Sequence, residues 1–576
     1  MTKRTTKKRH TKSITKTNDS NHDPFINITG TVQHISKLAS YYRVQFNHVD
    51  GTQHAIDIPR KLFGGQNKAI DMLLDAGAII PPDRGAAKEL IVAAQEDMGK
   101  RIFRLTDRVG WHGTSFVYFG KTFGPDCENL TLAKDANRNE ALGIRSGSLK
   151  AWRAGLMAAC TVSDQMIAAI CIAASGALFD IIPRTEPAIY HFHGARKIPG
   201  EADNVKSSSG KTLSARVGQS MFGRCTDTDL FGFNMTRNAL EEACFSCNNL
   251  VVTLDEDGTA GEGGSQAIHP RDLPYMIVGG KGRRRAASYA AQNGLSATVW
   301  KVPVITTSED ELDSPGKTRK EGAAVRMVPI PFPPTKAGGT FTAIKSKKKR
   351  DALAAKVEKT IKENFGVAMP RYLKNLVEER STIVVTATAI MNRFVADNCP
   401  TGDAWEQRCA RKFAILGVAS YLLSRWNIAP WTEERGTAAI ATLYKQSRSQ
   451  TVSANQATDN FLETIRRGIT IGRFPLMKKG TELPRGNKVW GITRTIAGVP
   501  RVIVISSWRF KRLVKPEAAA ELVLTELGRR NMLVTGADGN PKRQVLIKAL
   551  SHKRKRYVCI RGLVPKKKKG LPEKDG

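Results

Sequence analysis

The stretch Ser207-Ser208-Ser209-Gly210-Lys211-Thr212 indicates the fold of the central part of this chain. It follows a predicted strand over residues 188–193 and leads into a helical pattern over residues 213–221. Between a strand and a helix, backbone amides and the helix N-terminus can bind phosphate groups. A lysine there neutralises phosphate oxygens, and the hydroxyl that follows it binds Mg²⁺. The sequence therefore predicts an α/β fold with a phosphate-binding loop (P-loop) that takes ATP and Mg²⁺.

The residues expected to contact the nucleotide are Ser208, Ser209, Gly210, Lys211 and Thr212. The usual pattern has another glycine five positions before Gly210, where this chain has Val205. The nearest earlier glycines are Gly194 and Gly200. We infer that residues 195–206 are an insertion between the strand and the working end of the loop.

A strand that ends in two acidic residues supports the same interpretation. Residues 250–254, apolar except for Thr253, have the pattern of a buried strand and lead into Asp255-Glu256. At such a strand end, one carboxylate can join the Mg²⁺ shell and the other can activate the attacking water. We assign the first role to Asp255 and the second to Glu256. Taken alone, the pattern also fits an ordinary strand followed by a polar turn, because Asp257-Gly258 comes next. Together with the loop, it favours ATP hydrolysis.

Two further residues are candidates for completing the site. The short strand of residues 302–305 ends in Thr306-Thr307-Ser308. A polar residue there could sense the γ-phosphate, and we choose Thr307 before Thr306. Arg326 lies just past this strand and could reach the nucleotide of a neighbouring subunit as an arginine finger. The alternatives are a strand-end turn for Thr307 and a surface salt bridge for Arg326.

The charge of the chain points to a polyanionic partner. Lys and Arg total 90 against 53 Asp and Glu, a net charge of +37. This excess must lie on surfaces, because unpaired buried charge is costly. Nucleic acid is the expected partner, since neutralising its phosphates releases counterions. A solubility surface and anionic lipid are the other interpretations.

Other global features are those of a globular protein without a membrane segment. Hydrophobic residues make up 41% of the chain and charged residues 25%. No signal peptide is visible and the nine cysteines are scattered, which favours a cytoplasmic protein. The longest apolar run, residues 166–179, is too short to span a bilayer, so we expect a buried core helix.

Composition and pattern divide the 576 residues into several parts. We expect a disordered basic tail over 1–24, an α+β domain over 25–140, a P-loop ATPase core over 145–335, a helical region over 345–450, a winged-helix-like domain over 451–565 and a second basic tail over 566–576. In the α+β domain we expect strands around Asp50-Gly51 and helices near 67–76 and 86–95. Its Asp and His residues show no metal-ligand spacing, and we expect no catalytic site in it.

Two basic segments are candidates for contact with DNA. Lys281, Arg283, Arg284 and Arg285 lie among glycines, which let a loop approach a phosphate backbone closely. Near the C-terminus, Lys553, Arg554 and Lys555 join two predicted strands, as in the wing of a winged helix. The alternatives are a solvated basic turn for the first segment and a small structural α+β domain for the second.

Two other patterns favour packing over metal binding. Cys244 and Cys247 lie in an apolar helical pattern, and no second pair of ligands stands nearby for a structural zinc. His191 and His193 alternate along a predicted strand, where we expect them to pack or to lie near the phosphate loop. No Ser-His-Asp or Cys-His arrangement for nucleophilic catalysis can be argued.

Several stretches together resemble a known family. They are Val109-Gly110-Trp111-His112-Gly113, the Ser-Gly-Lys-Thr loop, Asn238-Ala239-Leu240-Glu241, Gly279-Gly280-Lys281-Gly282-Arg283 and Val325-Arg326-Met327-Val328-Pro329-Ile330-Pro331. Over roughly residues 100–335 they resemble the bacterial family described as domain of unknown function 927, whose members are labelled helicase-like and are carried on mobile elements. The chain is also similar to cassette chromosome helicases, which are hexameric AAA+ motors.

The resemblance implies an ATP-driven DNA motor with an AAA+ core that assembles into a homo-oligomer, expected to be a hexamer. In such a motor Mg²⁺-ATP lies between subunits, and loops around Lys281 pull on DNA. We expect a replicative helicase of a mobile genetic element. The alternatives are a nucleotide-regulated DNA-binding protein, such as an initiator or defence switch, and an inactive helicase derivative. Neither alternative would unwind DNA.

Overall fold

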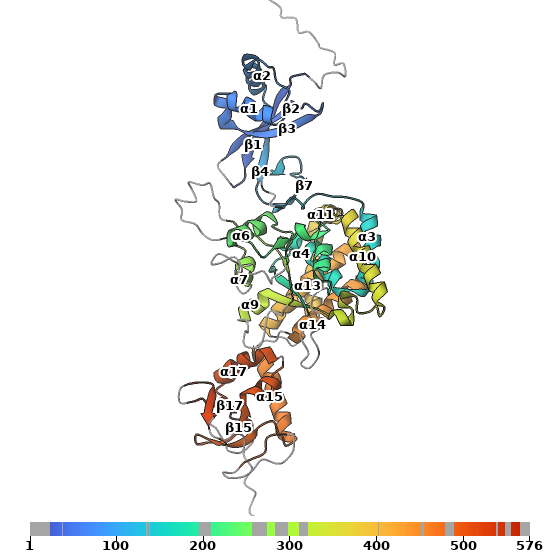
Figure 1. Cartoon of the computed structure of the whole chain (residues 1–576). Helices are drawn as coiled ribbons and strands as arrows, with labels where there is room; N and C mark the ends of the chain where they lie inside the picture. Colours follow the sequence, from blue (N-terminus) through green and yellow to red (C-terminus); the bar gives the residue numbers. More distant parts are fainter. Residues whose placement is uncertain are drawn as a thin grey trace, which may run out of the picture. The chain divides into compact units, whose positions relative to one another are not determined.

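The chain forms two compact units, seen in the computed structural model of Figure 1. The N-terminal unit contains residues 1–137 with 284–297, and the large unit contains residues 138–283 with 298–576. The structure describes residues 23–36, 39–133, 136, 139–194, 209–255, 273–282, 298–309, 321–400, 403–450, 454–477, 489–515, 517–536, 539–545, 547 and 555–564. Both units mix helices and strands, so the mixed α/β class predicted from the sequence is confirmed.

A five-stranded sheet forms the centre of the N-terminal unit. In sheet order its strands are β3 (Gln53–Pro59), β2 (Ser40–Asn47), β1 (Ile26–His34), β4 (Arg101–Thr106) and β8 (Leu130–Leu132). The first three pair antiparallel, whereas β4 and β8 run parallel to their neighbours. Helices α1 (Asn67–Asp75) and α2 (Arg84–Glu96) share an apolar core with this sheet. The strands predicted around Asp50-Gly51 and the two predicted helices are confirmed.

A second, smaller sheet follows in the same unit. It consists of β5 (Gly110–His112), β6 (Ser115–Tyr118) and β7 (Lys121–Phe123), which pair antiparallel in sequence order. Trp111 packs edge-on against Phe116 inside it.

Five parallel strands form the central sheet of the large unit. In sheet order they are β10 (Phe231–Gly232), β11 (Val252–Asp255), β12 (Val304–Ser308), β9 (Ile189–Gly194) and β13 (Met327–Phe332). Every residue of β9 and β12 is buried, as in parallel strands that are covered on both faces. Parallel strands end at one common edge, so the segments that follow them in sequence converge there.

Helices from before and after the strands surround this sheet. Those before residue 330 are α3 (Leu149–Val162), α4 (Asp164–Ser175), α5 (Lys211–Gln219), α6 (Arg237–Ser246), α7 (Leu273–Val278) and α9 (Glu321–Arg326). In α4 the residues from Gln165 to Ser175 are all buried, which confirms the predicted core helix. In the part of the chain that the structure describes, no helix has the length and apolarity to cross a membrane.

The helical region predicted from residue 345 onward is present. It consists of α10 (Lys347–Glu363), α11 (Ala368–Glu378), α12 (Arg380–Asn398), α13 (Ala404–Arg425) and α14 (Glu433–Gln450). α13 and α14 both contact α4, and α14 also contacts β13. The Tyr190 hydroxyl on β9 donates to the backbone oxygen of Lys412 on α13 at 2.7 Å. These helices therefore help to bury the parallel sheet.

Residues 454–564 contain a separate antiparallel sheet, and we call this part the C-terminal module. Its elements are α15 (Ala454–Thr470), β14 (Ile492–Ile496), β15 (Val499–Ser506), α16 (Ser507–Leu513), α17 (Ala520–Arg529), β16 (Lys542–Val545) and β17 (Lys555–Ile560). The sheet order is β14-β15-β17-β16. Phe461, Phe510 and Val523 join one apolar core with the sheet. β16 and β17 pair antiparallel, in agreement with the two strands predicted on either side of Lys553 and Arg554.

A buried lysine ties α13 to the start of β9. Lys412 Nζ donates to the backbone oxygens of Glu186 and Pro187 at 3.0 and 3.3 Å and to Glu186 Oε2 at 3.0 Å. Burial lowers the pKa of Lys412 to about 8, and the Glu186 carboxylate opposes that shift. The Lys412 side chain thus donates hydrogen bonds to two backbone oxygens that α13 would otherwise bury without a donor.

We predict that Lys412→Met lowers the local opening free energy of β9 and α13 by about 1–3 kcal/mol, because buried acceptors lose their donor. Hydrogen exchange of peptides that cover the two elements measures this. The matched control is Arg411→Met, an exposed neighbour on the same helix, which should change the value by no more than about 0.5 kcal/mol. Equal losses in both variants would contradict the anchoring role.

Candidate functional site

The end of the predicted P-loop has the backbone that its sequence requires. Gly210 has φ +90° and directly precedes α5, whose first residue is Lys211. A Cβ at position 210 would lie 2.7 Å from Thr340 Cγ2, so glycine is needed for both conformation and space. Lys211 is only 8% exposed, and its Nζ lies 3.4 Å from Ser209 Oγ. The cation is thus held at the N-terminus of a helix, where anions bind.

A later segment of the chain holds this loop in place. The backbone amide of Thr340 donates to the carbonyl oxygen of Ser209 at 2.9 Å. Gly339 packs so closely that an added Cβ would lie 2.7 Å from that same oxygen. The Thr340 hydroxyl also bonds the hydroxyl of Ser163 at 2.5 Å. The residues after β13 therefore fix the last residues before α5, a contact that the sequence did not indicate.

Three predicted residues from three different elements meet at one carboxylate oxygen. Thr212 Oγ1 donates to Asp255 Oδ1 at 3.2 Å. The hydroxyl of Thr307 donates to the same oxygen. Thr212 lies on α5, Asp255 ends β11 and Thr307 lies on β12, so the meeting point is the carboxyl edge of the sheet.

The two threonines of β12 face opposite sides of the sheet. Thr306 Oγ1 bonds His191 Nδ1 at 2.8 Å and therefore does not face Asp255. The strand alternates its side chains, which is why only Thr307 reaches the acidic residue. His191 and His193 are fully buried, with their rings stacked 5.7 Å apart. This fits the expectation that the two histidines pack.

Several predicted site residues cannot be placed. Ser208, Glu256, Arg283, Arg284, Arg285, Lys553 and Arg554 lie outside the described residues, as does the inferred insertion at 195–206. Of the predicted DNA contacts, Lys281 and Lys555 are described, and both are exposed. Lys281 forms an isolated bridge with Val299, and Lys555 is the first residue of β17.

Arg326 lies at the amino ends of the parallel strands, whereas Asp255 lies at their carboxyl ends. It ends α9 immediately before β13, and β13 runs parallel to β9 with Met327 beside Ile189. Its Nη1 donates to the backbone oxygen of Gly322 at 2.7 Å, and its guanidinium lies 5.4 Å from the ring centre of Tyr275. Within one chain, the structure therefore does not bring Arg326 to the Asp255 cluster.

The cysteine pair behaves as packed side chains. Cys244 and Cys247 are buried, and burial raises the pKa of Cys247 to about 12 and that of Cys244 well above its usual value. Neither belongs to a group of three or more potential metal ligands among the described residues. Their burial fits the expectation that the two cysteines pack.

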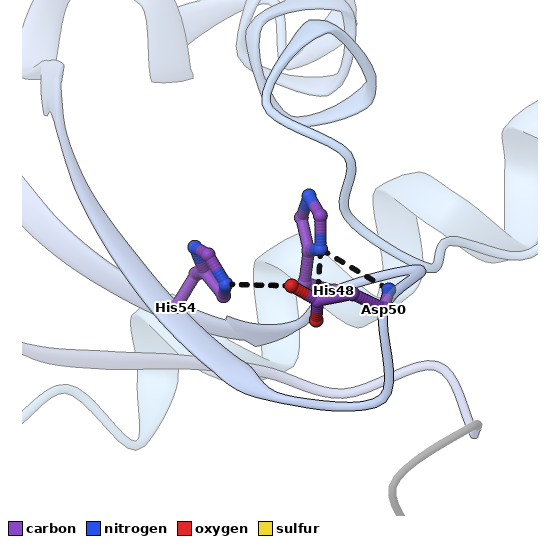
Figure 2. A group of neighbouring side chains, drawn as sticks. All are labelled: His48, Asp50 and His54. Atoms are coloured by element: carbon purple, nitrogen blue, oxygen red, sulfur yellow. Dashed lines mark hydrogen bonds and ion pairs between the residues drawn. The ribbon is translucent and has the colours of Figure 1, made fainter.

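One metal-ligand grouping contradicts the expectation for the N-terminal unit. His48, Asp50 and His54 surround the turn between β2 and β3, and their potential ligand atoms all lie within 4.8 Å of one another (Figure 2). The prediction that the Asp and His residues of this region show no ligand spacing was wrong. The hairpin brings His54 back to His48, which a search for helical or paired-cysteine spacing does not detect.

An exposed aromatic residue in the C-terminal module was also missed. Trp508 on α16 is 58% exposed, and the guanidinium groups of Arg509 and Arg512 lie 4.8 and 5.1 Å from its ring centre. Ser507 Oγ donates to the backbone oxygen of Arg556 on β17 at 3.2 Å, so exposed basic residues of that strand lie beside α16. The available signal in the sequence was the pair Trp508-Arg509, an aromatic residue next to an arginine.

A family model matches more than half of the chain. It is described as "Domain of unknown function (DUF927)" and matches residues 5–293 of 576. The chain belongs to the DUF927 family. The DUF927 match begins earlier than the resemblance seen from the motifs and ends before Val325. Most of the N-terminal unit therefore falls within the match, and the last motif lies outside it.

The fold of this DUF927 protein has a solved counterpart. A chain titled "SCCmec type IV Cch - active helicase" is similar over 93% of this chain and 93% of its own, with a TM-score of 0.58 and 15% sequence identity. At that identity the likeness concerns the fold. No curated protein matches the chain.

Proposed function

We propose that this protein is an ATP-driven DNA motor of the AAA+ type, acting as a replicative helicase of a mobile genetic element. The observation that carries the proposal is the convergence of Thr212, Asp255 and Thr307 beside Lys211. A buried cation at a helix N-terminus and an acidic strand end make a site for a nucleotide with a divalent ion.

The oxygen donors at this site fit Mg²⁺. Mg²⁺ prefers hydroxyl and carboxylate oxygens at about 2.0–2.1 Å in octahedral geometry, so adjacent ligands lie about 2.9 Å apart. Thr212 Oγ1 and Asp255 Oδ1 are 3.2 Å apart. When bound, Mg²⁺ would neutralise charge between the β- and γ-phosphates.

The protein's own residues have the remaining roles. Lys211 and the amides that open α5 would bind the phosphates, with Ser208, Ser209 and Gly210 around them. Thr307 would follow the γ-phosphate through its bond to Asp255. Glu256 would orient and deprotonate the attacking water.

The order of the strands supports this assignment. β12 lies between β9, which leads to the loop, and β11, which carries Asp255. Thr307 is therefore inserted between the phosphate loop and the acidic strand. This arrangement fits the AAA+ core that the family resemblance implies, and the similar fold titled as an active helicase agrees with it.

The position of Arg326 favours an oligomer. It stands at the amino end of β13, whereas the proposed nucleotide site is at the carboxyl end of the sheet. We propose that Arg326 serves the site of a neighbouring subunit, and that the assembly is a hexamer.

The C-terminal module is the proposed DNA-binding part, together with the basic segment from Lys281 to Arg285. Its order of elements, α15, β15, α16, α17 and the β16–β17 pair, follows the pattern of a winged helix with β14 added. Lys553, Arg554 and Lys555 would form the wing, and the +37 charge of the chain supports phosphate contact. Trp508 extends this surface with an aromatic face.

We predict that Lys211→Ala and Thr307→Val each lower DNA-stimulated ATP turnover by at least about 100-fold, as removal of one group that stabilises developing charge does. Phosphate release with and without single-stranded DNA measures this. Thr306→Val is the matched control, because its hydroxyl faces His191, and it should stay near wild type. DNA binding without turnover in the wild-type protein would instead favour the nucleotide-regulated or inactive alternatives.

We predict that Arg326→Ala loses turnover about 10³-fold or more, the range known for arginine fingers. Mixing it with Lys211→Ala should restore activity, because the second variant supplies Arg326 to the intact site of the first. Random mixing in equal amounts makes about a quarter of the interfaces competent in a ring of heterologous contacts. A chain that carries both Lys211→Ala and Arg326→Ala should restore no ATP turnover. If the mixture of the two single variants also restores no turnover, Arg326 does not act between subunits.

We predict that Trp508→Ala weakens single-stranded DNA binding about 5–150-fold, because base–aromatic stacking contributes about 1–3 kcal/mol. Trp508→Phe should retain most of the affinity. Arg512→Gln should lower the slope of log affinity against log salt by about one. Fluorescence anisotropy over a salt series measures both. Leu476→Ala, a second exposed apolar residue of the module, is the control. If Leu476→Ala weakened DNA binding as much as Trp508→Ala does, this would argue against base stacking on Trp508.

A further inference from the structure

The β2–β3 turn of the N-terminal unit gathers three potential ligands of a metal ion. His48 directly follows β2, Asp50 lies in the turn and His54 lies on β3 (Figure 2). His48 Nδ1 lies 2.9 Å from Asp50 Oδ1, and His54 Nε2 lies 3.4 Å from Asp50 Oδ2. The exposed fractions of the three side chains are 23%, 48% and 46%, so an ion can enter from solvent.

These spacings match a metal coordination sphere. Zn²⁺ binds His nitrogen and carboxylate oxygen at about 2.0–2.2 Å, so two ligands of a tetrahedral site lie about 3.4 Å apart. The spacings from the Asp50 carboxylate to His48 and His54, 2.9 and 3.4 Å, lie near this value. All three potential ligand atoms lie within 4.8 Å of one another.

The contacts of His48 place its imidazole against the carboxylate. His48 Nδ1 lies 3.2 Å from the backbone nitrogen of Asp50 and 2.9 Å from Asp50 Oδ1. A hydrogen bond from the His48 side chain to this carboxylate contributes to the low pKa of Asp50. A divalent ion bound here would take the place of the proton between the nitrogen and the carboxylate oxygen.

Neighbouring groups orient the carboxylate in advance. The backbone amide and the hydroxyl of Thr52 donate to Asp50 Oδ1 at 2.9 and 2.6 Å. These bonds hold the pKa of Asp50 well below its ordinary value, so the side chain is an anion at neutral pH. Partners of this kind fix ligand orientation and support metal affinity.

We propose that His48, Asp50 and His54 form a site for one first-row divalent transition-metal ion, with Zn²⁺ as the reference ion. Two imidazoles and one carboxylate leave a coordination position open to water or to an anionic ligand. The ion would link the two strands of the hairpin across its turn. This site is independent of the proposed nucleotide site, whose ligands are hydroxyl and carboxylate oxygens alone.

The test is zinc titration of the chelator-treated full-length protein by competition with a chromophoric chelator, with Co²⁺ absorption as a second readout. We expect one site that His54→Ala or Asp50→Asn weakens at least about 10-fold, since even outer partners contribute about 10–100-fold. Thr52→Val, which removes an outer partner, should weaken it about 10–100-fold. Both His54 and Asp50 are exposed, so these variants should fold, and circular dichroism checks this.

Two controls separate this site from others. Asp255→Asn removes the proposed Mg²⁺ ligand, and His22→Ala removes a histidine elsewhere in the sequence. Both should leave zinc affinity unchanged. The proposal is overturned if the wild-type protein shows no zinc binding in the competition titration. It is also overturned if His54→Ala and Asp50→Asn bind zinc as tightly as the wild type. The cluster would then be a hydrogen-bonded turn in which a proton occupies the place of the ion.

Discussion

The common carboxyl edge of a buried parallel sheet is the constraint on which the rest of the large unit depends. Asp255 ends β11 level with Thr307 on β12, and Gly194 ends β9 level with Phe332 of β13. Four strands therefore deliver their following residues to one line. Strand direction alone brings four features together at this line. They are the loop before α5, Asp255, Thr307 and the segment that holds Ser209. No local sequence preference could bring them together.

Such a sheet must be covered on both faces, and this explains the length of chain that the core needs. α4 precedes the first strand, whereas α13 and α14 come long after the last. Tyr190 and Lys412 join β9 to α13 through hydrogen bonds, and Phe413 packs edge-on against Tyr190. Burying an ammonium is costly unless it is paired, and here Glu186 and two backbone oxygens pair it. The helical region and the parallel strands thus form one packed core.

Local patterns in the sequence were enough to predict most elements and the meeting of Thr212 with Asp255. Apolar runs such as residues 250–254 identify buried strands, and Gly210 followed by Lys211 identifies a turn into a helix. Thr307 was chosen before Thr306 from the sequence, and strand register gives the physical reason, since Thr306 faces His191. Contacts made across long stretches of chain could not be predicted, because nothing near Ser209 encodes its bond to Thr340. The His48 cluster was missed for a related reason, since only the folded hairpin sets its spacing.

β13 connects the two ends of this arrangement for which roles are proposed. Its carboxyl end leads to Gly339 and Thr340, which hold Ser209, and its amino end begins directly after Arg326. Six residues of strand at about 3.3 Å each separate these ends by about 20 Å, farther than an arginine side chain can reach. The proposed role of Arg326 at a neighbouring subunit follows from this separation, because the strand that carries it away from Ser209 is fixed in register beside β9.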